Sequence, residues 1–554
     1  MQGRAGASTA PDMVHPAIEV NPRARFEILF AILLGLFLSA LDQTIVGPVL
    51  PRIVTDLRGA DYYTWVVTAY LVTSTVTVPI YGKLSDLYGR RPMLMLGIGL
   101  FLVGSALSGI SQEMWQLVFF RAIQGLGAGA IFPISLAVIG DLFTPAERGK
   151  YQGLFGAVFG VAFLVGPFLG GFLTDNISWH WVFYVNLPVG LVSLYFIWRL
   201  LPTIRRPEAG RNIDILGVLT SAAALVPILI ALTLAETGQW TDPGVIAGFA
   251  IGAFFLVAFV VVESRAADPM IPLDLFRNRT FAVSMVAMFF ATFGFATAII
   301  FLPLWFQVVQ GATSTESGYD LFPFLFGLIA SSIVSGQVIS RTGRYKALLV
   351  GAMAVVAVGL FLFTNLRADT PTPVLWAWMI VAGLGVGPMM AGFTIIVQNA
   401  VPFSRLGTAT SDLTLIRQIG TTVGLTVAFT IFRNNLTWGL LRGQIVAAGA
   451  PGGLVPQSAP QGFDLGQLTS VGSNGGGVGQ FLQQLPAQLQ PVFLDGFHRA
   501  FSIALANSMW IGVIAAILAC TAAALLHEIP LRTHLGEAVP EASATRISQA
   551  SGTD

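Results

Sequence analysis

The chain has 554 residues, of which 55% are hydrophobic and only 10% are charged. Soluble proteins carry about 25% charged residues, so this composition excludes a soluble fold and predicts an integral membrane protein. The net charge of +1 gives no basic surface for nucleic acid, and the single cysteine excludes an internal disulfide or a thiolate metal cluster.

Apolar segments of membrane-spanning length recur from residue 26 to residue 526. The first 25 residues contain no apolar core, so we do not expect them to be a cleaved signal peptide. We predict fourteen transmembrane helices, near 26–48, 63–82, 92–111, 114–140, 151–174, 181–201, 213–234, 243–262, 281–308, 318–340, 346–365, 374–396, 409–432 and 500–526. This even number puts both termini on one side of the membrane.

The distribution of basic residues predicts which side that is. Cytoplasmic loops of membrane proteins carry an excess of Lys and Arg. Most of the 29 Lys and Arg residues fall in loops on the amino-terminal side, whereas the predicted loops on the other side hold only Arg52, Arg58, Arg367, Arg433, Arg442 and Arg499. We therefore predict a multi-pass protein of the cell membrane with the lipid bilayer as a partner and both termini in the cytoplasm.

Two similar segments indicate a duplication. "GKLSDLYGRRPML" (82–94) follows the second predicted helix and "GQVISRTGRYKAL" (336–348) follows the tenth. A repeated basic loop is typical of transporters built from duplicated bundles. The predicted parts are a cytoplasmic tail (1–25), an N-terminal six-helix bundle (26–201), two inserted helices with linkers (202–280), a C-terminal six-helix bundle (281–526) and a second tail (527–554).

The C-terminal bundle contains a long extracytoplasmic loop, 433–499. Its Gly-, Pro- and Gln-rich text predicts a disordered tether, and its end, "FLQQLPAQLQPVFLDGFHRAF", predicts a short amphipathic segment on the outer membrane face. Two interpretations remain open here: a tether with an apolar end, or a binding site for an extracytoplasmic partner.

Two charged residues lie inside predicted spans. Asp42 interrupts the apolar run "LFLSALDQTIVGPVLP" (36–51), and Arg121 lies in the fourth helix. A helical rise of about 1.5 Å per residue puts both roughly 12–13 Å below the outer face. Intramembrane charges are costly and mark functional sites, and a buried carboxylate can exchange a proton when its surroundings change. The pair could therefore couple transport to protons or be a static ion pair.

Five segments resemble known motifs: "LDQTIVGPVLP" (41–51), "GKLSDLYGRR" (82–91), "RAIQGLGAG" (121–129), "GVAFLVGPFLGG" (160–171) and "WHWVFYVNLPVG" (179–190). Over residues 26–530 the chain resembles the major facilitator superfamily, in its fourteen-helix drug:proton antiporter branch. The resemblance implies an all-α integral membrane protein with the major facilitator fold, two six-helix bundles plus two inserted helices. It also implies a monomeric multidrug efflux transporter that exchanges small lipophilic substrates for protons by alternating access and needs no cofactor.

The resemblance assigns roles to individual residues. Proton coupling is expected of Asp42 and Arg121, and contact with substrate of Gln124, Phe306, Gln307 and Arg417. The cytoplasmic gate, which holds the outward-open state in the family, is expected at Asp86, Gly89, Arg90, Arg91 and Arg344. The helix-packing motif of antiporters is expected at Gly160, Gly166, Pro167, Gly170 and Gly171.

Several of these residues have alternative interpretations. Gln124, one helical turn after Arg121, could bind substrate or a neighbouring helix. Arg417 could join the two halves, meet an anionic substrate group or extend to the inner face. The glycines around Pro167 could form a rocking contact or ordinary tight packing. Trp305, beside Phe306, is expected in an interfacial aromatic belt.

The absence of further deep carboxylates restricts the expected cargo. Asp320 and Asp412 lie near predicted helix ends, so the pocket suits monocationic or neutral compounds better than dications. An alternative is a dedicated exporter of an endogenous metabolite or lipid that uses the same mechanism. An enzyme is disfavoured, because the five histidines form no His-x-x-His set and no Gly-x-x-x-x-Gly-Lys-Ser/Thr loop exists for ATP.

Overall fold

The computed structural model describes residues 22–59, 62–202, 213–237, 239–451, 455–458 and 489–531. Fourteen of the helices in these ranges are long and apolar enough to cross a membrane, and the same ranges contain no strand. The predicted all-α membrane fold is therefore confirmed. Most of the two predicted tails, 1–21 and 532–554, lies outside the described residues.

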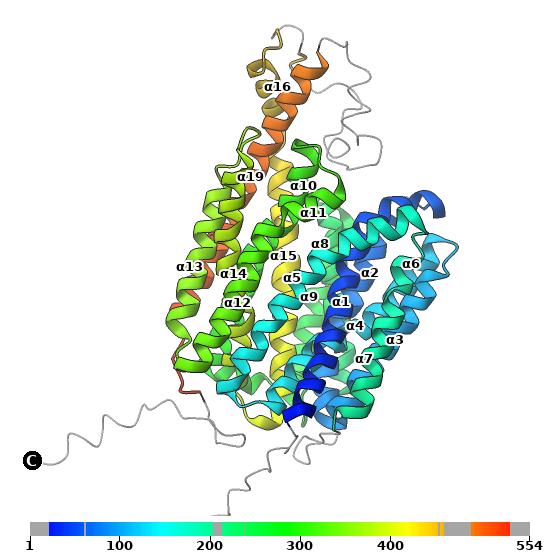
Figure 1. Cartoon of the computed structure of the whole chain (residues 1–554), viewed down its shortest axis with the longest axis vertical. Coiled ribbons are helices and arrows are strands. Elements are labelled where there is room, and N and C mark those ends of the chain that lie inside the picture. The colour runs from blue at the N-terminus through cyan, green and yellow to red at the C-terminus, as the bar shows by residue number, and fades with distance from the viewer. Residues whose placement is uncertain are drawn as a thin grey trace, which may run out of the picture.

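The first six spans form one bundle, drawn from blue to blue-green in Figure 1. The sixth span is divided in two by a break at Val185. The elements are α1 (Pro22–Leu57), α2 (Tyr63–Tyr88), α3 (Arg90–Gly109), α4 (Met114–Leu142), α5 (Pro145–Asn176), α6 (Trp181–Tyr184) and α7 (Asn186–Leu200).

The last six spans form the second bundle beside it (Figure 1). They are α10 (Arg279–Val309), α12 (Phe322–Thr342), α13 (Lys346–Phe363), α14 (Thr372–Ala400), α15 (Leu406–Asn435) and α19 (Gln490–Ala524). The shorter helices of this half are η2 (Leu273–Arg277), α11 (Ser314–Asp320), η3 (Phe403–Arg405) and α16 (Trp438–Ala447).

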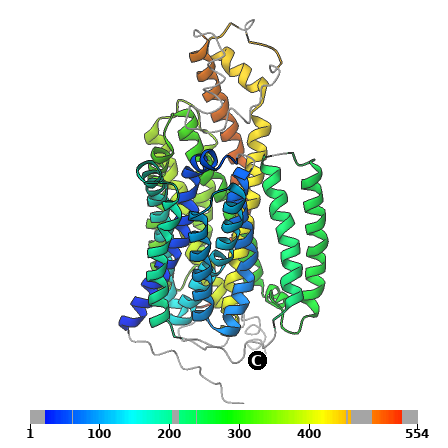
Figure 2. The same cartoon turned by 90° about the vertical axis from the view of Figure 1, so that its right-hand side faces the viewer.

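The inserted helices α8 (Ile215–Thr237) and α9 (Pro243–Arg265) form a hairpin that stands beside the two bundles (Figure 2). Helix α8 packs against α2 of the first bundle and α15 of the second. Val76 of α2, Leu229 of α8 and Val423 of α15 share one hydrophobic cluster. The hairpin therefore covers one seam between the bundles.

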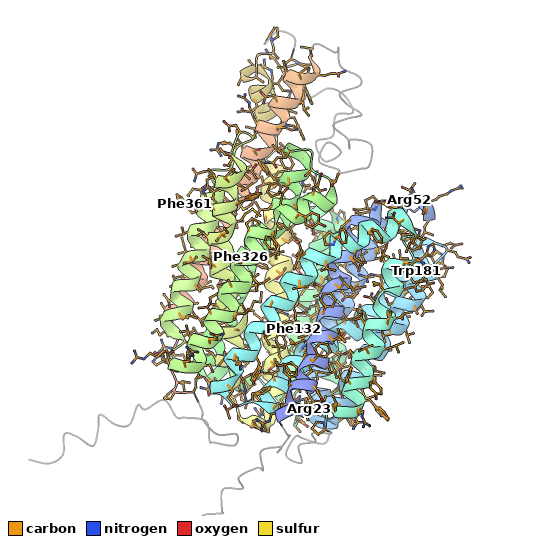
Figure 3. All side chains as sticks on the ribbon, viewed as in Figure 1. Arg23, Arg52, Phe132, Trp181, Phe326 and Phe361 are labelled. Atoms are coloured by element: carbon orange, nitrogen blue, oxygen red, sulfur yellow. The ribbon has the colours of Figure 1, made fainter. Side chains whose placement is uncertain are left out.

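The described chain begins and ends at the same end of the molecule, at Pro22 and Leu531 (Figure 1). Figure 3 shows Arg23 at this end and Arg52 at the other. We call the end that holds Arg23 the basic end, because the predicted basic loops lie there, and the other end the opposite end.

The loop 433–499 differs from its prediction at both of its borders. Helix α15 continues to Asn435, α16 follows it, and α19 begins at Gln490. Helix α16 and the beginning of α19 project beyond the bundles (Figure 1). A Cβ atom on Gly496 would lie 2.6 Å from Cα of Ile445, so the two helices are in close contact. The prediction of a segment lying on the membrane face is wrong for residues 490–499, because their apolar side chains pack against α16.

Candidate functional site

The two intramembrane charges predicted at equal depth contact each other. Arg121 Nη1 of α4 donates to Asp42 Oδ2 of α1 over 2.7 Å. Asp42 is 0% exposed and Arg121 is 2% exposed. A buried ion pair is stable only when further hydrogen bonds satisfy its polar atoms, so the neighbours of this pair matter.

Two amide side chains complete the surroundings of Asp42. Gln124 Nε2 donates to Asp42 Oδ1 over 2.8 Å and Gln124 Oε1 accepts from Arg121 at 2.8 Å. Asn186 of α7 donates to the same Asp42 oxygen over 3.1 Å and to Ser105 Oγ over 3.0 Å. Gln124 thus binds both members of the ion pair. Of its two interpretations, the geometry favours the one in which Gln124 hydrogen-bonds a neighbouring helix, here α1, rather than substrate.

The Tyr70 ring of α2 adds an apolar wall. Arg121 Cζ lies 4.2 Å from the centroid of this ring, within the range of a cation–π interaction. We call Asp42, Arg121, Gln124, Asn186 and Tyr70 the Asp42 network. Its members come from α1, α2, α4 and α7, so any change of charge on Asp42 acts on four helices of the N-terminal bundle.

Sequence reasoning missed Asn186, Ser105 and Tyr70. Asn186 had a visible signal, because it is an amide in the apolar segment "WHWVFYVNLPVG" (179–190). Ser105 and Tyr70 had none, since serine and tyrosine are common in membrane helices and their partners lie on other helices.

The predicted gate forms a buried ion network at the basic end. Arg90 Nη2 lies 2.6 Å from Asp86 Oδ1, and Arg90 Nε donates to Asp141 Oδ2 of α4 over 2.9 Å. Gly89 separates α2 from α3 with a φ of 100°, a conformation that other residues rarely adopt. Sequence reasoning missed Asp141, an acid that lies far from the loop in the sequence.

Asp86 also binds the second bundle. Its Oδ2 accepts from the backbone N–H of Thr408 at 2.8 Å and from the Thr408 hydroxyl at 2.9 Å, and Oδ1 accepts from Gly407 N at 3.2 Å. These groups form the first turn of α15, where unpaired N–H groups and the helix dipole attract a carboxylate. The gate therefore joins the bundles at the basic end.

The second copy of the loop forms no comparable gate. Gly343 also has a positive φ, 67°, but its ψ of -1° differs from the ψ of 154° at Gly89, so the two loops turn differently. Arg344, however, is exposed and has no carboxylate partner within the described residues. Arg344 therefore makes no gate contact in this conformation, since Ser340 stands where the first copy has Asp86, and its role in the gate stays a prediction. Arg91 is half-buried and makes no described ion pair.

Glycines bring α5 and α12 into backbone contact near the basic end. A Cβ atom on Gly336 would lie 2.0 Å from the carbonyl oxygen of Gly149, and one on Gly160 would lie 2.5 Å from the Ile329 side chain. Ser332 Oγ donates to the carbonyl of Gly153 over 3.2 Å. This face of α5 thus forms a second close contact between the bundles.

The other face of α5 packs against α1. Cβ atoms on Gly166 and Gly170 would lie 2.1 Å from Thr44 Oγ1 and 2.6 Å from the Ile45 carbonyl oxygen. Pro167 lies between these glycines, and Gly171 beside them is half-buried. Since Thr44 and Ile45 follow Asp42 closely in the chain, α5 connects the Asp42 network to the contact with α12.

Arg417 of α15 contacts the N-terminal bundle. Its Cζ lies 3.7 Å from the ring centroid of Phe132 in α4, and its Nη1 lies 3.8 Å from Met390 Sδ. Figure 3 shows Phe132 at a height between Arg23 and Arg52, so the guanidinium does not extend to the basic end. The geometry favours the interpretation in which Arg417 joins the two halves.

The predicted aromatic cargo contacts in α10 are not seen in this conformation. Phe306 is 0% exposed within the hydrophobic core of the C-terminal bundle. Trp305 is equally buried and donates to Ser502 Oγ over 2.9 Å, so its prediction as a belt residue is wrong. Gln307 is half-buried and donates to Ser317 Oγ of α11 over 2.8 Å. The Trp305 ring thus contacts α19, and the Phe306 ring lies beside it with the two ring centroids 5.4 Å apart.

Comparison with known proteins gives the family. Residues 32–425 match the family model described as Major Facilitator Superfamily. The chain is 39% identical over 401 residues to "Multidrug transporter protein MdtP" of Bacillus subtilis (strain 168), which covers 72% of this chain and 74% of that protein. It is 38% identical over 411 residues to "Multidrug resistance protein 3" of the same strain, covering 74% of this chain and 80% of that one.

A solved structure supports the fold. The proton:xylose symporter XylE aligns with 90% of this chain and 95% of its own, at a TM-score of 0.55 and 15% sequence identity. At that identity the likeness concerns the fold alone. With the matching family model, the two close relatives and fourteen spans, the chain belongs to the Major Facilitator Superfamily of multi-pass membrane transporters.

Proposed function

We propose that this transporter is a proton-coupled antiporter of the cell membrane that exports lipophilic compounds. The observation that carries the proposal is the Asp42 carboxylate, fully buried and bound to Arg121 at 2.7 Å. Intramembrane ionisable pairs mark ion pathways. Export is supported by relatives that are named a multidrug transporter and a multidrug resistance protein.

Protonation of Asp42 would change its contacts in a defined way. The ionised carboxylate accepts from Arg121, Gln124 and Asn186. A protonated Asp42 loses its attraction for the Arg121 guanidinium, which keeps its charge and needs another partner. Because α1 packs on α5 and α5 packs on α12, a shift of α1 reaches the contact between the bundles.

The closed basic end supports an alternating-access cycle. Asp86 joins α2 to α15, and the glycine face of α5 joins α12. If the basic loops lie in the cytoplasm, as the positive-inside rule predicts, this conformation is closed to the cytoplasm. In the proposed cycle Asp42 takes up a proton from outside in this state and releases it inside as cargo binds.

The charges near the seam support monocationic or neutral cargo. A single cation can compete with Arg121 for the Asp42 carboxylate, and a neutral compound needs no partner. Arg417, which contacts Phe132 across the seam, is a cation and would repel the second positive charge of a dication.

The proposal is tested with full-length protein in liposomes under an imposed pH gradient. Proton flux is followed when ethidium is added, for wild type, Asp42→Asn and the control Asp175→Asn, an exposed acid at the opposite end of α5. Flux in wild type and in the control but not in folded Asp42→Asn supports coupled antiport through Asp42.

Two other outcomes contradict the proposal. Equal flux in Asp42→Asn and wild type removes Asp42 from the coupling. No flux in any folded protein with a set of lipophilic monocations and neutral dyes rules out multidrug antiport and favours the dedicated exporter of one metabolite or lipid.

A further inference from the structure

The inserted hairpin carries a buried acid that neither the Asp42 network nor the gate uses. Glu263 lies in the last turn of α9 at the basic end and is 2% exposed. Its Oε1 accepts a hydrogen bond from the backbone N–H of Ile271. Its Oε2 has no hydrogen-bond donor within the described ranges. A buried carboxylate oxygen without a donor is costly.

Asp214, which precedes α8, shares this space with Glu263. Asp214 Oδ1 accepts from Gly217 N at 2.7 Å, but Oδ2 has no donor among the residues described. A Cβ atom on Gly217 would lie 2.4 Å from Asp214 Oδ2 and 2.7 Å from Glu263 Oε2. The two oxygens without donors therefore meet beside Gly217, where the absence of a side chain leaves room for them.

The two carboxyl groups are close enough for a side-chain hydrogen bond to each other. An ionised carboxylate only accepts hydrogen bonds, so this contact requires a proton on one of the two groups. Two adjacent carboxylates in a medium of low dielectric constant do not both ionise readily, as paired carboxyl groups in other proteins show.

The neighbouring charges do not relieve this pair. Asp412 of α15 is 2% exposed, and neither of its carboxylate oxygens has a hydrogen-bond partner in the described part of the chain. Its carboxylate interacts electrostatically with Glu263 and Asp86. It adds negative charge from the second bundle.

Two basic groups of the N-terminal bundle near this end are bound to other acids. Lys83 of α2 pairs with Asp268, in the linker after α9. Arg90 pairs with Asp86 and Asp141. Within the described ranges, neither Lys83 nor Arg90 forms an ion pair with Glu263 or Asp214.

We infer that Glu263 and Asp214 form a proton-binding site in which the two carboxyl groups share one proton at neutral pH. The proton on Glu263 Oε2 donates to Asp214 Oδ2, or the reverse, and its loss leaves two carboxylates side by side. The site is separate from Asp42 and does not depend on the proposed coupling.

The position of the site gives the proton a structural consequence. The linker after α9 binds α2 through the ion pair of Asp268 with Lys83. It also binds the second bundle at two points. Asp274 lies 2.5 Å from Arg405 Nη1, and Asn278 donates to the Ala400 carbonyl over 2.9 Å. Repulsion between ionised Glu263 and Asp214 acts at the start of this linker. Occupancy of the site therefore acts on a segment that contacts both bundles.

Infrared difference spectroscopy on the full-length protein in detergent, without substrate or pH gradient, tests the site. A protonated carboxyl band at neutral pH is expected in wild type. Glu263→Gln and Asp214→Asn should each remove the band of one carboxyl group, and the double variant should remove no more than either single variant. Asp42→Asn and Asp242→Asn, an exposed acid at the other end of the hairpin, should retain this band.

Two results overturn the inference. A band unchanged in both single variants means that both groups are ionised. Losses that add in the double variant mean two separately protonated acids and no shared proton. If Glu263→Gln fails to fold, Asp214→Asn decides the question alone, since Asp214 is only half-buried. The measurement uses no cargo, so its failure is distinct from a failure of antiport.

Discussion

The Asp86 carboxylate of α2 accepts both the backbone N–H and the hydroxyl of Thr408, at 2.8 and 2.9 Å, in the first turn of α15. One side chain of the N-terminal bundle thereby caps a helix of the C-terminal bundle. The same carboxylate pairs with Arg90, which holds it in place. The contacts that join the bundles at the basic end thus include a charge at a helix N-terminus.

Asp86→Asn should open the basic end. The amide keeps the shape of the side chain but loses the charge, and hydrogen bonds to charged groups contribute about 1.5–3 kcal/mol. The population with an open basic end should rise roughly 10- to 100-fold, since about 1.4 kcal/mol corresponds to a factor of ten. Spin labels at the exposed positions Tyr88 and Arg344, in a Cys520→Ser background, report the distance between the bundles.

Asp175→Asn is the matched control for this change, because it removes an exposed charge at the opposite end. Its distance distribution should equal that of wild type. An unchanged distribution in Asp86→Asn would show that the cap of α15 does not hold the basic end closed.

Gly336→Ala should slow transport. The new Cβ would lie 2.0 Å from the Gly149 carbonyl oxygen, so α5 and α12 must separate. Such overpacking costs about 1–3 kcal/mol, which corresponds to a roughly 5- to 100-fold smaller population of the closed basic end. Initial rates of dye efflux from loaded vesicles measure the effect.

Gly351→Ala provides the comparison, because nothing lies within 4 Å of a Cβ at that helical glycine. It should transport like wild type. Equal efflux by Gly336→Ala and Gly351→Ala would mean that the close α5–α12 contact has no role in the cycle.

The contact between Arg417 and Phe132 should appear as a coupling energy in a double-mutant cycle. Arg417→Gln and Phe132→Leu together should cost less than the sum of the single changes, by about 0.5–2 kcal/mol. Unfolding in mixed micelles supplies the free energies. The control pairs Arg417→Gln with Phe326→Leu, a change at an exposed ring on α12, and the two changes in the free energy of unfolding should add. A coupling energy of equal size in both pairs would argue against a specific contact between Arg417 and Phe132.

Asn186→Leu should destabilise the N-terminal bundle. The change removes a donor to Asp42 at 3.1 Å and leaves a buried charge less satisfied, at a cost of about 1–3 kcal/mol. Asn176→Leu, an exposed asparagine at the end of α5, should change the free energy of unfolding by less than about 0.5 kcal/mol. Equal stability of the two variants would contradict the described role of Asn186.

The membrane-spanning helices and the equal depth of Asp42 and Arg121 could be predicted from the sequence alone. A run of apolar residues defines a membrane helix almost by itself, and the constant helical rise converts the positions of Asp42 and Arg121 into equal depths. The carboxylate Asp86 was also recognised, because topology alone does not explain an acid in a basic loop.

The partners of these residues could not be predicted from the sequence. Asp86 binds backbone N–H groups of Gly407 and Thr408, and backbone donors leave no signal in side-chain identity. The burial of Phe306 could not be predicted either, because an apolar helix has no polar face to indicate which side meets lipid, cargo or protein. The pairing of Glu263 with Asp214 depends on how the hairpin folds back, which no local pattern encodes.

The most direct test of coupling at Asp42 is proton release on cargo binding. Purified protein in weakly buffered detergent is mixed with ethidium at saturating concentration, and a pH indicator follows protons released per bound dye. The account predicts release by wild type and by Asp175→Asn, and none by Asp42→Asn that still binds ethidium. Release by a folded Asp42→Asn variant equal to that of wild type would contradict it.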